Sequence, residues 1–183
     1  MTELLPTQEI ESIRAQFQEL GHVGIASSFD PNFVELARKQ ADTLVKRQRY
    51  YGVNNSKMYT INRFDRKALP DFTELVDTVH SRVTELGGSV WPETPNLIEH
   101  HEMEQGALGM PHYDSWRLVG KVAMINLLGS SRFLILEDNK PDVVLDEYFV
   151  EEGGMIVLDT ESKHFHQGIA VDKRVNLTMS YVK

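Results

Sequence analysis

Three stretches in the first half of the chain repeat apolar residues at the spacing of an amphipathic helix. In the first stretch, Ile10, Ile13, Phe17 and Leu20 fall on one stripe. The stretches are residues 6–20, 32–49 and 70–86, and short apolar runs at residues 23–25 and 58–61 have the length of strands. A loop at residues 52–56 and a glycine pair at residues 87–88 are expected to separate these elements. The first half is therefore predicted to be mainly helical.

From Asn96 onward, short apolar segments alternate with turn residues. We expect strands at residues 119–128, 132–136, 143–150, 155–158, 165–171 and 175–182. The sequence Gly129-Ser130-Ser131 is expected to form a hairpin turn between the first two of these strands. Many short strands with frequent turns are typical of a sandwich or a barrel. The pattern predicts an α+β, β-rich fold with the N-terminal helices packed on the outer face of the β-structure.

The length and composition fit one soluble domain. The chain has 183 residues, of which 41% are hydrophobic and 25% charged. Residues 1–95 are expected to support a β-core at residues 96–183 and to supply a lid over its substrate. No apolar run has the length of a membrane span, and no signal-peptide pattern is present, so a cytoplasmic location is expected. The absence of cysteine excludes disulfides and thiolate chemistry.

The charge is spread unevenly. A net charge of -8 argues against broad, non-specific binding of nucleic acid. Residues 38–67 nevertheless carry nine basic side chains against Asp42 and Asp65, with four aromatic side chains among them. Such a segment suits stacked bases and phosphates, an acidic peptide or a small anionic metabolite. The alternative is an ordinary solvated helix face followed by a loop.

Three side chains in the second half have the order and spacing of a metal site. His112 and Asp114 are two residues apart, so on a strand they point to the same face. A histidine from the pair His164 and His166 would complete two imidazoles and one carboxylate. This set leaves coordination positions open and suits non-haem Fe(II) chemistry. A lone HxD is weak, but Arg174 follows His166 by eight residues and makes the ordered set more specific.

From Asn96 to the end, the chain resembles the Fe(II)/2-oxoglutarate-dependent dioxygenase superfamily, whose members carry HxD…H…Rx[S/T/N] on a double-stranded β-helix of the jelly-roll type. His112, Asp114 and His166 match its iron ligands. Arg174 and Asn176 match the residues that anchor 2-oxoglutarate. The resemblance implies that the protein uses Fe(II), 2-oxoglutarate and O2, and releases succinate and carbon dioxide while it hydroxylates a substrate.

Two local resemblances point to different substrates. Residues 164–169 (HFHQGI) are similar to a string of the lysyl hydroxylases, which favours His166 over His164 as the ligand. Residues 174–178 (RVNLT) are similar to the AlkB-like nucleic-acid demethylases. The latter family's upstream NxY is replaced here by His101 and Met103, and Ser180 stands where a second arginine would be. His101 is then a weak substitute for the missing tyrosine contact.

Three readings of the function remain at this stage. The first is hydroxylation of a protein side chain or a small molecule. The second is AlkB/TET-like oxidation of a nucleobase, which the overall charge disfavours. The third is a cupin-like metal-binding module without enzymatic activity, although such a module has no need of an anchor such as Arg174.

Other residues receive secondary roles. Tyr113, Trp116, Arg117 and Asn126 are candidates for the substrate pocket, with core packing favoured for Trp116. Residues 99–104 contain two adjacent histidines, which point to opposite faces of a strand and so do not share a metal. This segment is expected to be a solvated acidic stretch. His22 and His80 are expected to be ordinary loop and helix-surface residues.

Overall fold

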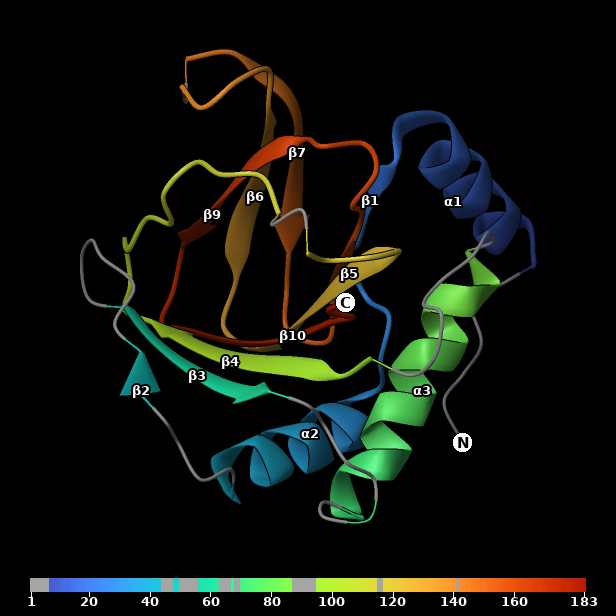
Figure 1. Ribbon diagram of the computed structural model, residues 1–183, viewed down its shortest axis with the longest axis vertical. Helices are drawn as coiled ribbons and strands as arrows, with labels where there is room; N and C mark the ends of the chain where they lie inside the picture. Colours follow the sequence, from blue (N-terminus) through green and yellow to red (C-terminus); the bar gives the residue numbers. More distant parts are fainter. Residues whose placement is uncertain are drawn as a thin grey trace.

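The computed structural model describes residues 7–43, 48–49, 56–62, 67, 70–86, 95–114, 117–140 and 142–183. Within these residues the chain forms three helices and ten strands, and the strands make two sheets (Figure 1). Three features expected from the sequence lie outside the described residues. They are Trp116, the glycine pair at 87–88 and the loop at 52–55. Part of the basic segment, at residues 44–47, 50–55 and 63–66, also lies outside them.

The helices are α1 (Thr7–Leu20), α2 (Pro31–Thr43) and α3 (Asp71–Glu85). They confirm the three periodic stretches, with one correction. The second stretch was expected to stay helical to Arg49, but Gln48 and Arg49 form the short strand β2 (Gln48–Arg49). These two residues pair with Tyr59 and Met58 of the neighbouring strand, so sheet pairing replaces helical hydrogen bonding there.

The larger sheet has seven antiparallel strands in the order β1-β8-β5-β10-β4-β3-β2, and the smaller has three in the order β7-β6-β9. The remaining strands of the larger sheet are β1 (His22–Ile25), β3 (Ser56–Asn62), β4 (Leu97–Met103), β5 (Lys121–Leu128), β8 (Met155–Asp159) and β10 (Arg174–Ser180). The smaller sheet consists of β6 (Ser131–Leu136), β7 (Val144–Val150) and β9 (Phe165–Ala170).

The chain crosses between the sheets at Gly129, which corrects the expected hairpin. β5 belongs to the larger sheet and β6 to the smaller, so the two strands do not pair. Gly129 has φ of 69°, and a Cβ there would lie 2.2 Å from the carbonyl oxygen of Lys173. Only glycine fits such a turn without strain. From β6 onward the strands divide between the two facing sheets, which confirms the predicted double-stranded β-helix.

A second correction concerns β4, which was expected to be a solvated acidic stretch. It is an inner strand of the larger sheet, paired with β10 on one side and β3 on the other. Ile98 and His100 are buried on the face toward the helices, while Glu99 and His101 lie on the face toward the smaller sheet. A polar sequence forms a central strand here because its inward face borders a polar interior rather than an apolar core.

The helices cover the outer face of the larger sheet, as predicted (Figure 1). Their apolar stripes pack on alternate residues of the strands, among them Ile125, Val157, Leu177 and Met179. Each such buried aliphatic side chain contributes about 1.5–3 kcal/mol by leaving water. None of the helices in the described residues is long and apolar enough to cross a membrane.

The space between the two sheets is divided into an apolar and a polar half. Near β5, β6 and β8 it is filled by a cluster of Val122, Phe133, Ile135, Val150, Ile156 and Leu158. Near β4, β9 and β10 many of the inward residues are polar, and His166, Arg174 and Asn176 among them are buried. Burying polar groups is costly unless they are partnered, so the polar half is the place to look for a functional site.

Candidate metal centre

The structure brings His112, Asp114 and His166 together, although 52 residues separate Asp114 from His166 (166 − 114). One ligand atom from each residue lies within 4.8 Å of the others. The Nε2 atom of His166 is 4.0 Å from Oδ1 of Asp114, and the two imidazole rings are 4.4 Å apart between centroids. Within the described residues this is the one group of three or more such side chains that could surround a metal ion.

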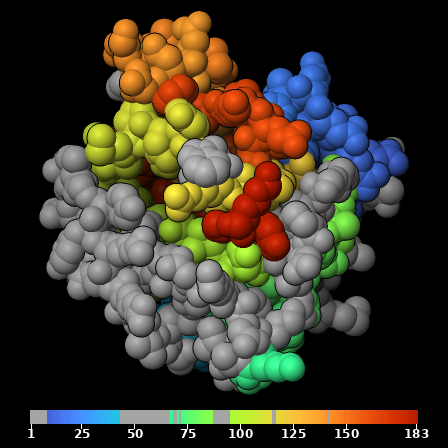
Figure 2. All heavy atoms as spheres, in the orientation of Figure 1, coloured from blue at the N-terminus to red at the C-terminus, as the bar shows by residue number. Residues whose placement is uncertain are grey.

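Backbone pairing fixes the two histidines opposite each other. The amide of His112 donates to the carbonyl of His166 at 3.1 Å, and the amide of His166 donates to the carbonyl of His112 at 2.7 Å. The segment before His112 continues this contact along β9 through a bridge between Leu108 and Ile169. Figure 2 shows the same neighbourhood, where the yellow-green and orange-red parts of the chain pack side by side.

The orientation of both rings leaves one nitrogen of each available. Nδ1 of His112 is 2.8 Å from the carbonyl oxygen of Met110, and Nδ1 of His166 is 3.2 Å from that of His164. A carbonyl accepts, so each Nδ1 carries the hydrogen and each Nε2 keeps its lone pair. The lone pair is the part of an imidazole that binds a metal.

Burial sets the charge state of the cluster. Loss of water, and after it the neighbouring His112, lower the pKa of His166 to about 3, so the ring of His166 is neutral near pH 7. Loss of water also raises the pKa of Asp114, an effect that His112 opposes. A divalent cation would reverse the cost of the buried carboxylate by supplying the missing positive charge.

His164 takes no part in the cluster. Its Nε2 atom lies 2.8 Å from the carbonyl oxygen of Leu20 at the end of α1, and its ring packs against His22. Of the two histidines that the sequence left open, the geometry therefore favours His166.

Arg174 is also buried between the sheets. Its guanidinium lies next to Gly168 of β9, which follows His166 by two residues. Its Nη2 atom contacts Sδ of Met124 at 2.9 Å and donates to the amide oxygen of Asn176 at 2.7 Å. Its Nε and Nη1 atoms have no hydrogen-bond partner among the described residues. Burial lowers the pKa of Arg174 to about 10, which still leaves it charged at neutral pH. A buried cation with free donors is costly and suits an anionic ligand.

Two further polar groups without a hydrogen bond in the described part of the chain share the inward face of β4 and β10, one of them 4.0 Å from a carboxylate oxygen of Glu99. Nε2 of His101 and Oγ1 of Thr178 are shielded from water without a hydrogen bond within the described residues. Burial, and then the charge of Arg174, lowers the pKa of His101 to about 3, so its ring is neutral. A neutral imidazole and a hydroxyl can both donate to a carboxylate. Thr178 was missed from the sequence, although the alternation from Arg174 through Asn176 places it on the same face.

Gly168 was also missed, and its role follows from a close approach. A Cβ at Gly168 would lie 2.9 Å from Nη1 of Arg174. We expect Gly168→Ala to displace the guanidinium and to weaken 2-oxoglutarate binding about 10-fold or more, since overpacking costs about 1–3 kcal/mol. Calorimetric titration of the metal-loaded protein measures this. Gly106→Asn is the control, because a Cβ at Gly106 meets nothing within 4 Å and asparagine tolerates its φ of 75°. Unchanged affinity in Gly168→Ala would contradict the assignment.

Other candidates have structural roles or lie at the surface. Asn126 is buried and donates to the carbonyls of Gly129 and Val150, so it ties the turns between the sheets rather than lining a pocket. Arg38, the first residue of the basic segment, donates to the carbonyl of Leu127 and pairs with Glu152 at 2.9 Å. Arg117 is exposed, and Tyr113 is half exposed with its ring edge against Phe165.

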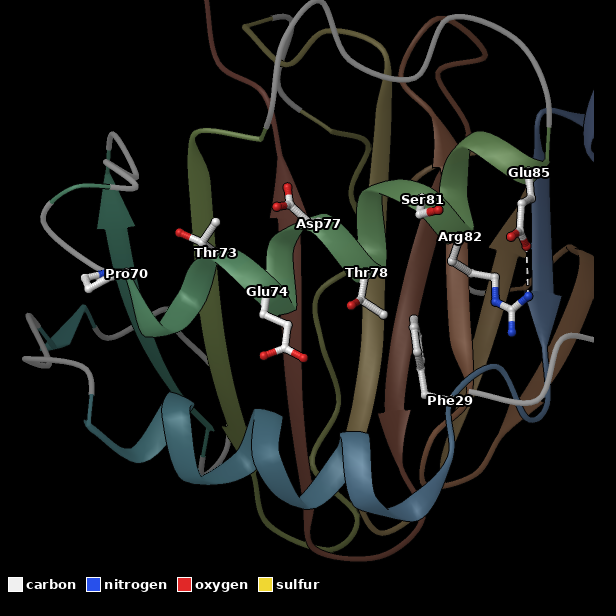
Figure 3. A pocket seen from close by; sticks show the side chains of 9 residues that line it. All are labelled: Phe29, Pro70, Thr73, Glu74, Asp77, Thr78, Ser81, Arg82 and Glu85. Atoms are coloured by element: carbon white, nitrogen blue, oxygen red, sulfur yellow. Dashed lines mark hydrogen bonds and ion pairs between the residues drawn. The ribbon is translucent and has the colours of Figure 1, made fainter. Parts of the chain in front are cut away.

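A cavity of about 670 Å³ lies elsewhere, on the helical layer (Figure 3). Its walls are Phe29 and one side of α3, with carboxylates at Glu74, Asp77 and Glu85. None of its residues belongs to the cluster. The cavity with this volume is therefore not the candidate metal site, which is formed by His112, Asp114 and His166.

The fold is shared with solved oxygenase structures, whereas no protein-family model and no curated protein matches the chain. A 2OG-Fe(II) oxygenase-family oxidoreductase from Burkholderia pseudomallei is 14% identical with a TM-score of 0.71, over 98% of this chain and 94% of that one. The non-haem α-ketoglutarate-dependent epimerase SnoN of nogalamycin biosynthesis is 13% identical with a TM-score of 0.72, over 97% and 82%. A prolyl hydroxylase from Trichoplax adhaerens, solved with a peptide fragment of hypoxia-inducible factor, is 12% identical with a TM-score of 0.67, over 96% and 89%. At these identities the likeness establishes the fold.

Proposed function

We propose that this protein is an Fe(II)- and 2-oxoglutarate-dependent dioxygenase. The observation that carries the proposal is the pairing, between the two sheets, of an open three-ligand cluster with a buried guanidinium that has two nitrogens without a hydrogen bond among the described residues. Several proteins with this fold are themselves described as 2-oxoglutarate-dependent oxygenases, which supports it. When bound, iron and 2-oxoglutarate supply the oxidation of a substrate by O2, with release of succinate and carbon dioxide.

The cluster fits iron by the chemistry of its donors. His112 and His166 would each supply an imidazole nitrogen and Asp114 a carboxylate oxygen, a donor set that suits iron and would leave coordination positions open. Their task is to bind the metal and to hold it at a fixed place between the sheets. The carbonyls of Met110 and His164 keep the rings oriented.

The anchor fits a dicarboxylate. We assign the distal carboxylate of 2-oxoglutarate to Arg174, whose Nε and Nη1 atoms have no hydrogen-bond partner among the described residues and can donate charge-assisted hydrogen bonds. Asn176 holds the guanidinium from the other side. His101 and Thr178 offer further donors on the same face. We propose that these donors take the place of the tyrosine that contacts 2-oxoglutarate in the AlkB-like enzymes. A metal-binding module without enzymatic activity offers no reason for this buried cation, so we favour the enzyme.

The reaction on the primary substrate is proposed at a coarser level. We infer hydroxylation of a protein side chain or a small molecule, which is the simplest outcome of this chemistry. Oxidation of a nucleobase is less favoured because the net charge is -8 and because Arg38, of the basic segment, serves the fold. We also propose one domain over residues 1–183, since β1 and β3 from the first half pair into the same sheet as β4 and β8. A cytoplasmic location remains the expectation from the sequence.

An anaerobic titration tests the proposal. The metal-free protein is titrated with Fe(II) and then with 2-oxoglutarate while its visible spectrum is recorded. We expect a charge-transfer band that requires both additions. Glutarate, which keeps both carboxylates and lacks the keto group, is the matched control and should compete without producing a band. A folded protein that binds Fe(II) and 2-oxoglutarate without any band, or binds neither, would refute the proposal.

A further inference from the structure

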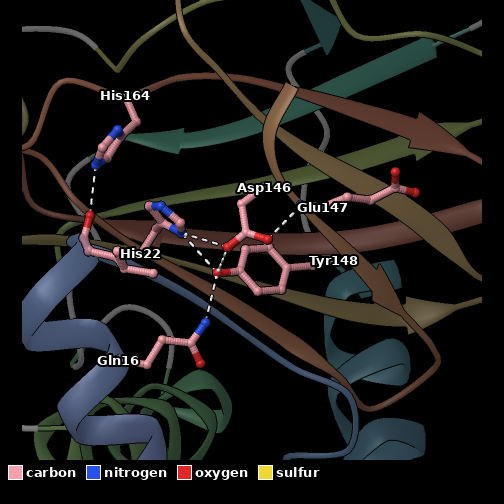
Figure 4. A network of polar contacts seen from close by, with 7 residues as sticks. Gln16, His22, Asp146, Glu147, Tyr148 and His164 are labelled. Carbon is pink, nitrogen blue, oxygen red and sulfur yellow. Dashed lines mark hydrogen bonds and ion pairs between the residues drawn. The ribbon is translucent and has the colours of Figure 1, made fainter. Parts of the chain in front are cut away.

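A partly buried polar network joins α1, β1 and β7 (Figure 4). The hydroxyl of Tyr148 donates to Asp146 at 2.8 Å and accepts from the side-chain amide of Gln16 at 3.2 Å. Nδ1 of His22 lies 2.9 Å from the same hydroxyl. Because that hydroxyl already donates to Asp146, His22 must be the donor to it. His22 was expected to be an ordinary loop residue, whereas it is buried as the first residue of β1; His80, on α3, is partly buried.

The network reaches the loop before β9 through His164. The rings of His22 and His164 meet edge to face with centroids 4.8 Å apart. Nε2 of His164 donates to the carbonyl of Leu20 at 2.8 Å, which is one of the carbonyls left free at the end of α1. His164 therefore has its ring held on two sides, by α1 and by His22.

The backbone around His164 is held as well. Lys163 has φ of 51°, a conformation that side-chain-bearing residues adopt only when their surroundings impose it. The amide of Asp159 donates to the carbonyl of Gly21 at 2.8 Å, and a Cβ at Gly21 would lie 2.0 Å from Oγ of Ser162. The loop before β9, at residues 160–164, therefore packs against the junction of α1 and β1.

This loop carries the carbonyl that orients a candidate metal ligand. Nδ1 of His166 donates to the carbonyl of His164 at 3.2 Å, and Nε2 of the same ring points toward Asp114 at 4.0 Å. Any shift of His164 therefore moves the acceptor that sets the rotation of the His166 ring. Nothing in the proposed chemistry uses His164, His22 or Tyr148 directly.

We propose that His164 is a positioning residue for the metal centre, held by His22 and Tyr148, and that this network sets the metal affinity by fixing the ring of His166. The inference rests on the proposed function, because it takes His166 as a ligand. Partners that orient metal-binding histidines commonly change metal affinity about 10- to 100-fold when they are removed.

Co(II) is the probe, because its visible absorption reports the ligand geometry directly. The full-length protein, freed of metal, is titrated with Co(II), and the affinity and spectrum are compared between variants. We expect His164→Ala to lose about 10- to 100-fold in affinity and to change the spectrum. His164→Gln should recover much of the loss, since its amide N–H can still reach the carbonyl of Leu20. Tyr148→Phe should lose about 3- to 10-fold, because it frees His22 without touching the loop.

Arg14→Ala is the matched control. Arg14 also ties α1 to the rest of the protein, by donating to the carbonyl of Glu85 at 3.0 and 2.7 Å, but it makes no contact with the network. Its loss should lower the melting temperature without changing Co(II) affinity. Equal affinity in folded His164→Ala and wild type would overturn the inference. If His164→Ala does not fold, unchanged affinity in Tyr148→Phe overturns it instead. A wild type that binds no Co(II) would count against the proposed function itself.

Discussion

His166→Ala is expected to abolish iron-dependent turnover of 2-oxoglutarate, with a loss of about 1,000-fold or more. The variant leaves His112 and Asp114 as the two protein donors, and it opens the dry side of the cluster where His166 is buried. A loss of that size corresponds to about 4 kcal/mol, which is within the several kcal/mol that a bound metal contributes to a reaction. Succinate formation, followed by chromatography, measures the effect.

The same loss is expected for Asp114→Ala, for a different reason. Asp114 is the single anionic donor of the cluster, so its removal leaves a divalent cation with two imidazoles and no carboxylate to offset its charge. His80→Gln serves as the control, since His80 lies on α3 and outside the cluster. Turnover within about twofold of wild type in either ligand variant would remove these residues from the active site.

The second large effect is expected at Arg174, where binding and stability should move in opposite directions. Arg174→Leu removes the donors for the distal carboxylate, and we expect 2-oxoglutarate to bind about 100- to 1,000-fold more weakly, as for loss of one partner of a buried pair. The ligand-free variant should be as stable as wild type or more so, because a buried guanidinium with two unpartnered nitrogens no longer has to be desolvated. Titration calorimetry and thermal unfolding measure the two effects.

Arg82 offers a matched comparison. It is also buried, but both of its Nη atoms have partners: they donate to Glu85 at 2.8 Å and to the carbonyl of Ser28 at 3.0 Å. Arg82→Leu should therefore lower the melting temperature while leaving 2-oxoglutarate affinity unchanged. Fe(II) binding should survive in Arg174→Leu. An Arg174→Leu protein that binds 2-oxoglutarate normally, or that is destabilised as much as Arg82→Leu, would show that Arg174 serves the fold.

These two sets of variants test the metal cluster and the 2-oxoglutarate anchor separately. His166 lies on β9 of the smaller sheet and Arg174 on β10 of the larger, and Gly168, two residues after His166, lies against the guanidinium. Loss of a ligand should remove metal binding first, whereas loss of the anchor should leave metal binding and remove the co-substrate. Metal binding therefore reports on the cluster, and 2-oxoglutarate binding in the metal-loaded protein reports on Arg174.

The sequence was sufficient wherever the signal was local. The stripe of Ile10, Ile13 and Phe17 predicts a helix by itself, because a 3.6-residue period requires no knowledge of the partner surface. The short strands after residue 96 were predicted for the same reason. The ordered set from His112 to Arg174 identified residues that the fold brings together between the two sheets. This was possible because few residue types bind a metal ion or a dicarboxylate. Their roles as ligands and anchor remain predictions.

Tertiary structure decided whatever depended on a neighbour distant in sequence. At Gly129 the chain crosses to the other sheet instead of forming a hairpin, and it passes there against the carbonyl of Lys173. Residues 97–103 form an inner strand instead of a solvated segment because β3 and β10 pair with them. The same holds for His22, which is buried where β1 pairs with β8 and where the rings of Tyr148 and His164 meet it. The choice between His164 and His166 follows from the carbonyl of Leu20, which occupies one ring and leaves the other facing Asp114. The sequence by itself thus determined which chemical groups are present and in what order, because composition and period are properties of one stretch. Which of them face each other was decided by strand pairing, a property of two stretches that no local pattern contains.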